Sequence, residues 1–189
     1  AGTSILYVRD DGRVGIKTTS PTKTLEVNGD AKITGFASFQ APAAKVERAF
    51  DKSINSGTWT SIDFTSELFD NDNIHDTSTN NTRLTCKTAG IYQISGNVLF
   101  QGNATGLRRI RILRTPTGGG TVLPIAQLDV PNVGSAVPGE GPALSISTLF
   151  KLNVDDYIEL QVYQDSGGSL NLTYTAYISM YFGMVKVSD

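Results

Sequence analysis

Apolar and polar residues alternate along most of the chain after residue 45, as they do in β-strands with one buried face. Residues 90–100 and 157–163 show this alternation most clearly. The apolar residues that share a face in these two segments are Tyr92, Ile94, Val98, Phe100, Ile158, Leu160 and Val162. We count about eight to ten such strands, separated by Gly- and Pro-containing turns, and this spacing predicts a β-sandwich or jelly roll.

The last strand of this pattern, residues 170–187, has apolar or aromatic side chains on both faces. One face carries Leu172, Tyr174, Ala176, Ile178, Met180, Phe182 and Met184. The other face includes Tyr177, Tyr181 and Val185. In a sandwich only one face of a strand meets the partner sheet, so the second face needs another cover. A neighbouring copy of the chain would supply it, and we expect these three residues at a subunit interface.

Residues 1–40 form a separate region of short apolar segments divided by turn signals such as Asp11-Gly12, Ser20-Pro21 and Asn28-Gly29. Strands this short bury too little apolar area to offset their ordering entropy, and copies of the same chain are the simplest partners. We therefore expect a stem or attachment segment at 1–40, a linker at 41–45 and a head at 46–189.

The composition agrees with an all-β protein, because only 18% of the residues are charged, against about a quarter in an average domain. The net charge of −2 argues against a nucleic-acid partner, which needs a basic surface. No apolar stretch approaches the roughly 20 residues of a membrane-spanning helix, so no membrane insertion is expected. Residues 1–10 show no signal-peptide pattern. The single cysteine, Cys86, is expected to be a buried structural thiol.

The polar segment at residues 70–81 holds the candidates for catalysis and metal binding. His75 is the only histidine, and no Gly-x-Ser-x-Gly motif accompanies it, so we expect no enzyme. Asp70, Asp72 and Asp76 begin like a calcium loop, but glycine is missing at its sixth position, and Asn81 replaces the glutamate at its twelfth. A solvated turn without a cofactor is favoured over a calcium site.

Two further segments are candidates for ligand binding. In the basic run 108–114, Arg109 and Arg111 share a strand face, and no aromatic platform for nucleic acid accompanies them in the sequence. These arginines either pair with carboxylates across a subunit boundary, the favoured alternative, or bind an anionic sugar. The longest loop, residues 129–142, adds Asn132, Ser135 and Glu140, since rigid sandwiches present function on loops.

Three segments of the head resemble a known family. Residues 70–95 contain an Asn/Asp-rich turn followed by TRLTCKTAGIYQIS, residues 149–160 read LFKLNVDDYIEL, and residues 175–187 form a closing strand. Together they resemble the globular heads of the C1q/tumour-necrosis-factor family, with Asp155-Asp156 where that family has Gly-Asp. The resemblance implies a ten-stranded jelly roll that forms a homotrimer around an aromatic-lined axis.

The N-terminal region resembles a second family. Residues 14–35, VGIKTTSPTKTLEVNGDAKITG, are similar to a repeat of bacteriophage fibres and bacterial surface proteins, Val-Gly-Ile-Gly-Thr-x-x-Pro followed by Leu-x-Val-Asn-Gly. Lys17 replaces the second glycine of the repeat. The resemblance implies an intertwined trimeric stalk, although the self-cleaving chaperone domain that often follows the repeat in fibres is not evident.

Taken together, these features predict a trimeric phage or bacterial surface fibre. Its tip would bind a host-surface glycan or protein, and its stem would contact other virion or surface proteins. The expected location is the virion surface, or alternatively the bacterial cell surface. A capsid or sheath decoration protein that stabilises the particle without binding a ligand is the alternative function. A glycan hydrolase assembled between subunits is a third possibility, for which the sequence provides no positive sign.

Overall fold

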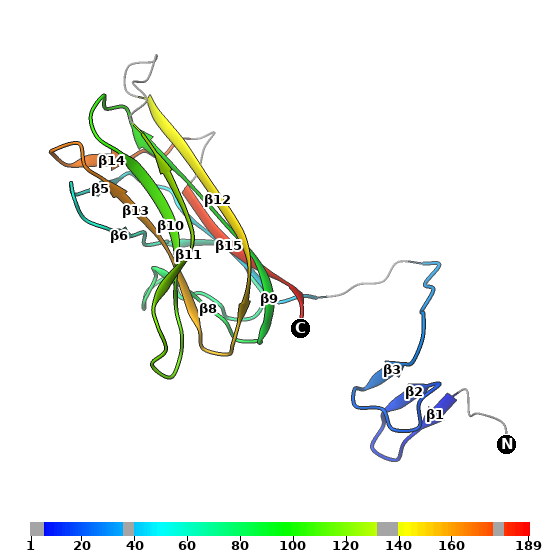
Figure 1. Ribbon diagram of the computed structural model, residues 1–189. Coiled ribbons are helices and arrows are strands. Elements are labelled where there is room, and N and C mark those ends of the chain that lie inside the picture. The colour runs from blue at the N-terminus through cyan, green and yellow to red at the C-terminus, as the bar shows by residue number, and fades with distance from the viewer. Residues whose placement is uncertain (1–5, 36–39, 132–139, 176–179) are drawn as a thin grey trace. The chain divides into compact units, whose positions relative to one another are not determined.

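A computed structural model describes residues 6–35, 40–131, 140–175 and 180–189 (Figure 1). Every regular element in these residues is a β-strand, which confirms the predicted all-β class. No helix in this part of the chain is long and apolar enough to cross a membrane. The chain divides into two compact units, Ala1–Gln40 and Ala41–Asp189, which we call the N-terminal unit and the head.

The N-terminal unit contains a small three-stranded sheet in the order β1-β2-β3. Its strands are β1 (Leu6–Val8), β2 (Val14–Ile16) and β3 (Leu25–Val27). β1 and β2 pair antiparallel through a turn in which the Gly12 N–H donates to the Arg9 carbonyl at 3.0 Å, whereas β2 and β3 pair in parallel. Gly12 has φ +83°, a conformation that glycine adopts without steric cost.

Two positions in this unit, Gly15 and Lys17, have backbone surroundings that restrict the side chain. A Cβ atom on Gly15 would lie 2.3 Å from the Thr18 carbonyl oxygen, so only glycine fits there. Lys17, which stands at the second glycine of the repeat, has φ +56°, a left-handed conformation that is unfavourable for a residue with a Cβ. Both positions therefore favour glycine, although position 17 is a lysine.

The N-terminal unit has almost no core of its own. Within its described residues only Gly15 and Pro21 are buried. The side chains of Leu6, Val8 and Leu25 are 61%, 62% and 60% exposed. Burying each of these side chains against another surface would add about 1.5–3 kcal/mol to the stability of the unit.

The head is a sandwich of two sheets (Figure 1). The seven-stranded sheet has the order β5-β14-β9-β15-β4-β7, with β12 also paired to β9. Its strands are β4 (Ala43–Arg48), β5 (Lys52–Ile54), β7 (Ser66–Asp70), β9 (Gly90–Gln101), β12 (Glu140–Leu152), β14 (Leu170–Leu172) and β15 (Met180–Ser188). The five-stranded sheet has the order β11-β10-β13-β6, with β8 also paired to β13. Its strands are β6 (Thr60–Ser61), β8 (Arg83–Thr85), β10 (Arg108–Thr115), β11 (Leu123–Val130) and β13 (Tyr157–Gln164).

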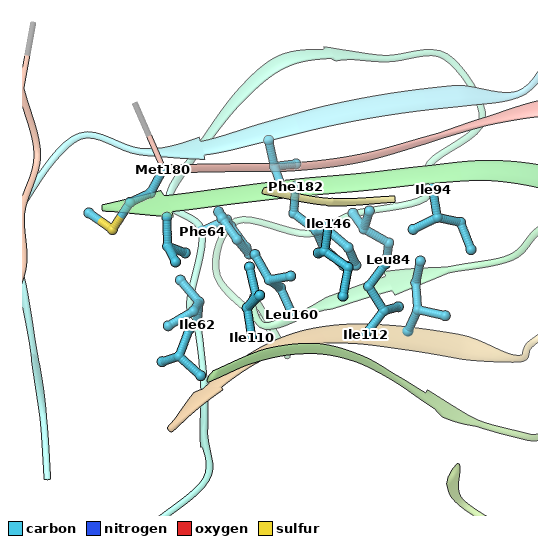
Figure 2. Packing of buried hydrophobic residues seen from close by; sticks show 14 of the residues in the cluster. Ile62, Phe64, Leu84, Ile94, Ile110, Ile112, Ile146, Leu160, Met180 and Phe182 are labelled. Carbon is cyan, nitrogen blue, oxygen red and sulfur yellow. The ribbon is translucent and has the colours of Figure 1, made fainter. Parts of the chain in front are cut away.

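The core lies between these two sheets. Figure 2 shows side chains from both of them, such as Ile94 of β9 and Ile112 of β10, pointing into the same interior. The seven residues that the alternation of residues 90–100 and 157–163 assigned to one face are all fully buried, which confirms that assignment. Cys86 is buried as well, and its thiol donates to the Thr88 carbonyl at 3.3 Å.

Two boundaries differ from those expected. The predicted strand 170–187 is two strands, because β14 ends at Leu172 and β15 begins at Met180, and Tyr174 between them is partly exposed. The predicted linker 41–45 overlaps β4, which begins at Ala43, and Ala44 is buried against the core. Small residues resemble a linker in the sequence, but here they fit a strand that pairs with the end of β15.

The head has two distinct ends. At one end Pro42 accepts a hydrogen bond from the Lys186 N–H at 2.8 Å, and β9 begins there at Gly90. At the other end Gln101 pairs with Glu140, and Arg108 pairs with Gln164. We call this the distal end, because it is opposite the point where the chain enters the head from residue 40. The segments 102–107 and 165–169 therefore both connect strands at the distal end.

Candidate functional site

The outward face of the seven-stranded sheet carries a shallow hollow of about 270 Å³. We call this surface the β15 face; the residues that define it are Lys45, Phe69, Gln93, Ser95, Tyr181 and Val185. Phe69 is 52% exposed and Val185 38%, and the ammonium group of Lys45 lies 4.6 Å from the centre of the Tyr181 ring. The inner face of the seven-stranded sheet packs against the core, whereas its outward face leaves large apolar side chains accessible.

The structure places two of the three predicted interface residues on the β15 face. Tyr181 and Val185 alternate with the core residues Phe182 and Met184 along β15, so they point away from the sandwich interior. Tyr177 lies outside the described residues. The participation of these residues in an interface stays a prediction.

A second partly apolar surface lies at the edge of the sandwich where β11 and β12 approach each other. Leu123 and Leu128 of β11 are both partly exposed there. Because β11 pairs only with β10 among the described strands, its outer backbone groups also face solvent. We call this surface the β11 edge.

The arginines of β10 lie as their alternation predicts. Ile110 and Ile112 are buried, whereas Arg109 and Arg111 point outward from the five-stranded sheet. The Nε and Nη2 atoms of Arg111 donate to Gln161 Oε1 at 2.8 and 2.6 Å, and its guanidinium carbon lies 3.9 Å from the centre of a Trp59 ring. Burial lowers the pKa of Arg111 from its ordinary value.

Arg109 forms an ion pair with Asp129 of the neighbouring strand, at 3.5 Å, and pairing of these arginines across a subunit boundary stays a prediction. The expectation that no aromatic platform accompanies them is wrong. Arg109 lies 5.1 Å from the Tyr163 ring, and Trp59 packs against Tyr163 at 5.5 Å. Trp59 and Tyr163 are far from β10 in the sequence, and only the sheet brings the three segments together.

His75 is buried, although the sequence suggested a solvated loop. Its Nδ1 atom lies 2.9 Å from Glu67 Oε1, and its Nε2 atom lies 3.3 Å from the Asn81 carbonyl oxygen. Its backbone N–H donates to Asp70 at 2.8 Å. The imidazole thus links β7 to the loop before β8, and its hydrogen bonds account for the burial of a polar side chain.

The three aspartates of this loop do not form a common site. Asp70 accepts hydrogen bonds from the Asp72 and His75 N–H groups, and Asp72 accepts one from the Thr88 hydroxyl. Asp76 Oδ1 accepts three, from the Thr79 N–H and from the N–H and hydroxyl of Ser78. These bonds, first of all the one from Thr79, lower the pKa of Asp76 to about 2. Across the described residues, no group of three His, Cys, Asp or Glu side chains is arranged to hold a metal ion.

The same loop and β8 enclose a second hollow, of about 380 Å³, which we call the Arg83 pocket. Its lining residues are Asn73, Ile74, His75, Asp76, Thr79, Asn80, Arg83, Thr85 and Lys87. The sequence analysis did not identify Arg83 or Lys87 as candidates. A basic pair four residues apart has no diagnostic motif, and only the folded loop places polar groups opposite these two residues.

Comparisons with known proteins identify the architecture of the head. No protein-family model and no curated protein matches the sequence. Among solved structures, murine APRIL at pH 8.5 is 12% identical, with a TM-score of 0.57 over 78% of this chain and 100% of that chain. The Eiger TNF of S. frugiperda is 14% identical, with a TM-score of 0.58 over 79% of this chain and 94% of that chain. The head has a tumour-necrosis-factor-like jelly-roll fold.

The expected jelly roll is thus confirmed, while identities this low show the fold alone. The TNF-like head contains twelve strand segments in its described residues, against the ten expected, because several segments are only two or three residues long. Of the residues predicted to bind a ligand, Asn132 and Ser135 lie outside the described residues. Glu140 begins β12 opposite Gln101 at the distal end, and its side chain is not described.

Proposed function

We propose that this protein is a homotrimeric, non-enzymatic fibre component on a virion or bacterial surface. In this proposal the N-terminal unit is a trimeric stem that contacts other structural proteins, and the TNF-like head recognises a host-surface glycan or protein. The observation that carries the proposal is the β15 face, where Phe69, Tyr181 and Val185 are accessible around a hollow on an otherwise well-packed sandwich.

The presence of two different apolar surfaces on one head supports a closed ring of subunits. A cyclic trimer is built from a heterologous contact, in which one surface of each copy meets a different surface of the next. The β15 face and the β11 edge are such a pair. In this arrangement Val185 and Tyr181 of one copy pack against Leu123 and Leu128 of the next.

The N-terminal unit supports the same symmetry and the fibre setting. Its exposed Leu6, Val8 and Leu25 side chains need a cover, and three copies wound together would supply one. The similarity of residues 14–35 to fibre repeats is strengthened by Gly15 and Lys17, whose backbone geometry calls for glycine. A phage or bacterial surface location follows from that similarity.

Recognition is assigned to the distal end, because it is the end of the head away from residue 40. Arg109 and Arg111 lie in the distal half of β10, next to the strand that leads into the loop with Asn132 and Ser135. Their guanidinium groups, the amide of Gln161 and the ring of Trp59 provide polar and aromatic contacts on one surface. A surface that combines arginine and aromatic side chains suits protein or glycan ligands.

Sedimentation velocity of the full chain at micromolar concentration tests the proposal. The expected result is a single species with three times the chain mass of 20.2 kDa. A stable monomer under these conditions would contradict the trimer and, with it, the fibre.

Adsorption of the purified protein to candidate bacterial cells, with and without deletion of residues 131–139, tests whether this segment takes part in recognition. Equal adsorption of both forms would contradict that assignment.

A further inference from the structure

The Arg83 pocket differs from the β15 face in its chemistry. Its lining consists mainly of amide, hydroxyl and charged side chains, and its volume of about 380 Å³ is within the range of small-molecule sites. It lies between the loop that contains Asn73 and Asn80 and the strand β8, on a part of the head that the trimer proposal does not use.

The guanidinium of Arg83 is held in place without being neutralised. It stacks on the Tyr157 ring, with its central carbon 4.0 Å from the ring centre. Its Nε atom is buried and has no hydrogen-bond partner within the described residues. Glu159, which is paired with Arg83 across β8 and β13, instead accepts a hydrogen bond from the Thr82 hydroxyl at 2.7 Å. Arg83 forms no ion pair with a described carboxylate, so its positive charge is available to an anion in the pocket that it lines.

The charges that line the pocket favour an anionic ligand. Arg83 and Lys87 provide two cationic groups, and Lys87 forms no ion pair with any described residue. Asp76 is the opposing carboxylate, and its Oδ1 atom is already saturated by hydrogen bonds from Ser78 and Thr79. A planar guanidinium binds carboxylates and sulfates through two parallel hydrogen bonds.

We propose that the Arg83 pocket binds one acidic sugar unit, with its carboxylate or sulfate on Arg83 and Lys87. The pocket is too large for a simple ion, and its remaining polar groups suit sugar hydroxyls. These groups are the side chains of Asn73, Thr79, Asn80 and Thr85. This site is separate from the distal recognition surface proposed above, because Arg83 pairs with the beginning of β13 and Lys87 lies just before the start of β9. It does not depend on the trimer, because every lining residue comes from one chain.

Isothermal titration of the 189-residue chain with defined sugars tests this site. The probes are N-acetylneuraminic acid and glucuronic acid, with neutral N-acetylglucosamine and inorganic sulfate as comparisons. We expect saturable binding of at least one acidic sugar and no binding of the neutral sugar. Absence of binding by both acidic sugars overturns the proposal. Sulfate binding as tight as that of the acidic sugars also overturns it, because the sugar ring would then contribute nothing.

Single substitutions test whether the acidic sugar binds in the Arg83 pocket. Arg83→Gln should weaken acidic-sugar binding about tenfold or more, and Arg83→Lys, which keeps the charge but loses the planar donors, should weaken it less. Lys87→Gln should also weaken it, whereas Lys23→Gln in the N-terminal unit is the charge-matched control and should not. Loss of binding in Arg109→Gln but not in Arg83→Gln overturns the pocket in favour of the β10 arginines. Sedimentation of the same samples reports the trimer separately, and thermal melting shows that each variant is folded.

Discussion

Arg114 and Asp156 form an ion pair at the end of the core, with the arginine Nη2 atom 2.8 Å from the aspartate Oδ2 atom. Asp156 is only 1% exposed, and it also accepts hydrogen bonds from the N–H groups of Thr117 and Asn153, each at 3.0 Å. One buried carboxylate thus joins the β10–β11 hairpin to the turn before β13. It is the aspartate at the Gly-Asp position of the family that the head resembles.

Replacing Asp156 by Asn should destabilise the head by about 3 kcal/mol, because Arg114 would lose the partner of a buried ion pair. The measurement is urea unfolding followed by fluorescence. Asp129→Asn is the matched control, since its pair with Arg109 is largely exposed and should contribute less than about 1 kcal/mol. Equal losses in the two variants would contradict the role assigned to Asp156.

Stability should fall in acid. Burial by itself would raise the pKa of Asp156, but hydrogen bonds from the Asn153 N–H and from Arg114 lower it below its ordinary value of 3.8. The pKa of Asp63, which lies against Lys52 and Arg48, is lowered despite burial as well. A carboxyl with a lowered folded pKa contributes stability above its unfolded pKa and loses it as the pH falls through the folded pKa. We therefore expect the melting temperature to fall below about pH 4.

The comparison that checks this pH dependence is Asp156→Asn. Its melting temperature should fall less steeply between about pH 5 and pH 2, since one of the contributing carboxyl groups has been removed. A melting temperature of the unaltered protein that is the same at both ends of this range would contradict the prediction.

Asp155→Gly should stabilise the head by about 0.5–1 kcal/mol, because Asp155 has φ +64°, where glycine has no steric penalty. This residue stands where the resembled family has glycine. Val154→Gly is the control, since Val154 does not have a positive φ and glycine there adds only unfolded-state entropy. Thermal melting of both variants checks the prediction, and destabilisation by Asp155→Gly would refute it.

Val185→Lys should shift the protein from trimer toward monomer, because a charge on the β15 face would have to be buried in the proposed contact. Val154→Lys, an exposed valine in the turn after β12, is the matched control and should leave the assembly unchanged. Sedimentation across a concentration series measures the dissociation. An unchanged trimer in Val185→Lys would place the interface elsewhere on the head.

The sequence by itself determined which apolar side chains of β9, β10 and β13 face the core. Ile110 and Ile112 face the core while Arg109 and Arg111 face outward, because consecutive side chains of a strand point to opposite sides whatever the strand pairs with. The turn at Gly12 is equally local, and the Asp11-Gly12 turn signal predicted it.

Only the tertiary structure decided which residues meet across strands. Arg111 donates to Gln161, 50 residues later in the chain, and Arg114 donates to Asp156, 42 residues later. The stack of Arg111 on Trp59, the burial of His75 and the polar pocket around Arg83 likewise depend on the pairing of distant segments. Alternation specifies the face on which a side chain lies, but not the strand beside it. The buried positions were therefore predictable, whereas the arrangement of the candidate sites was not.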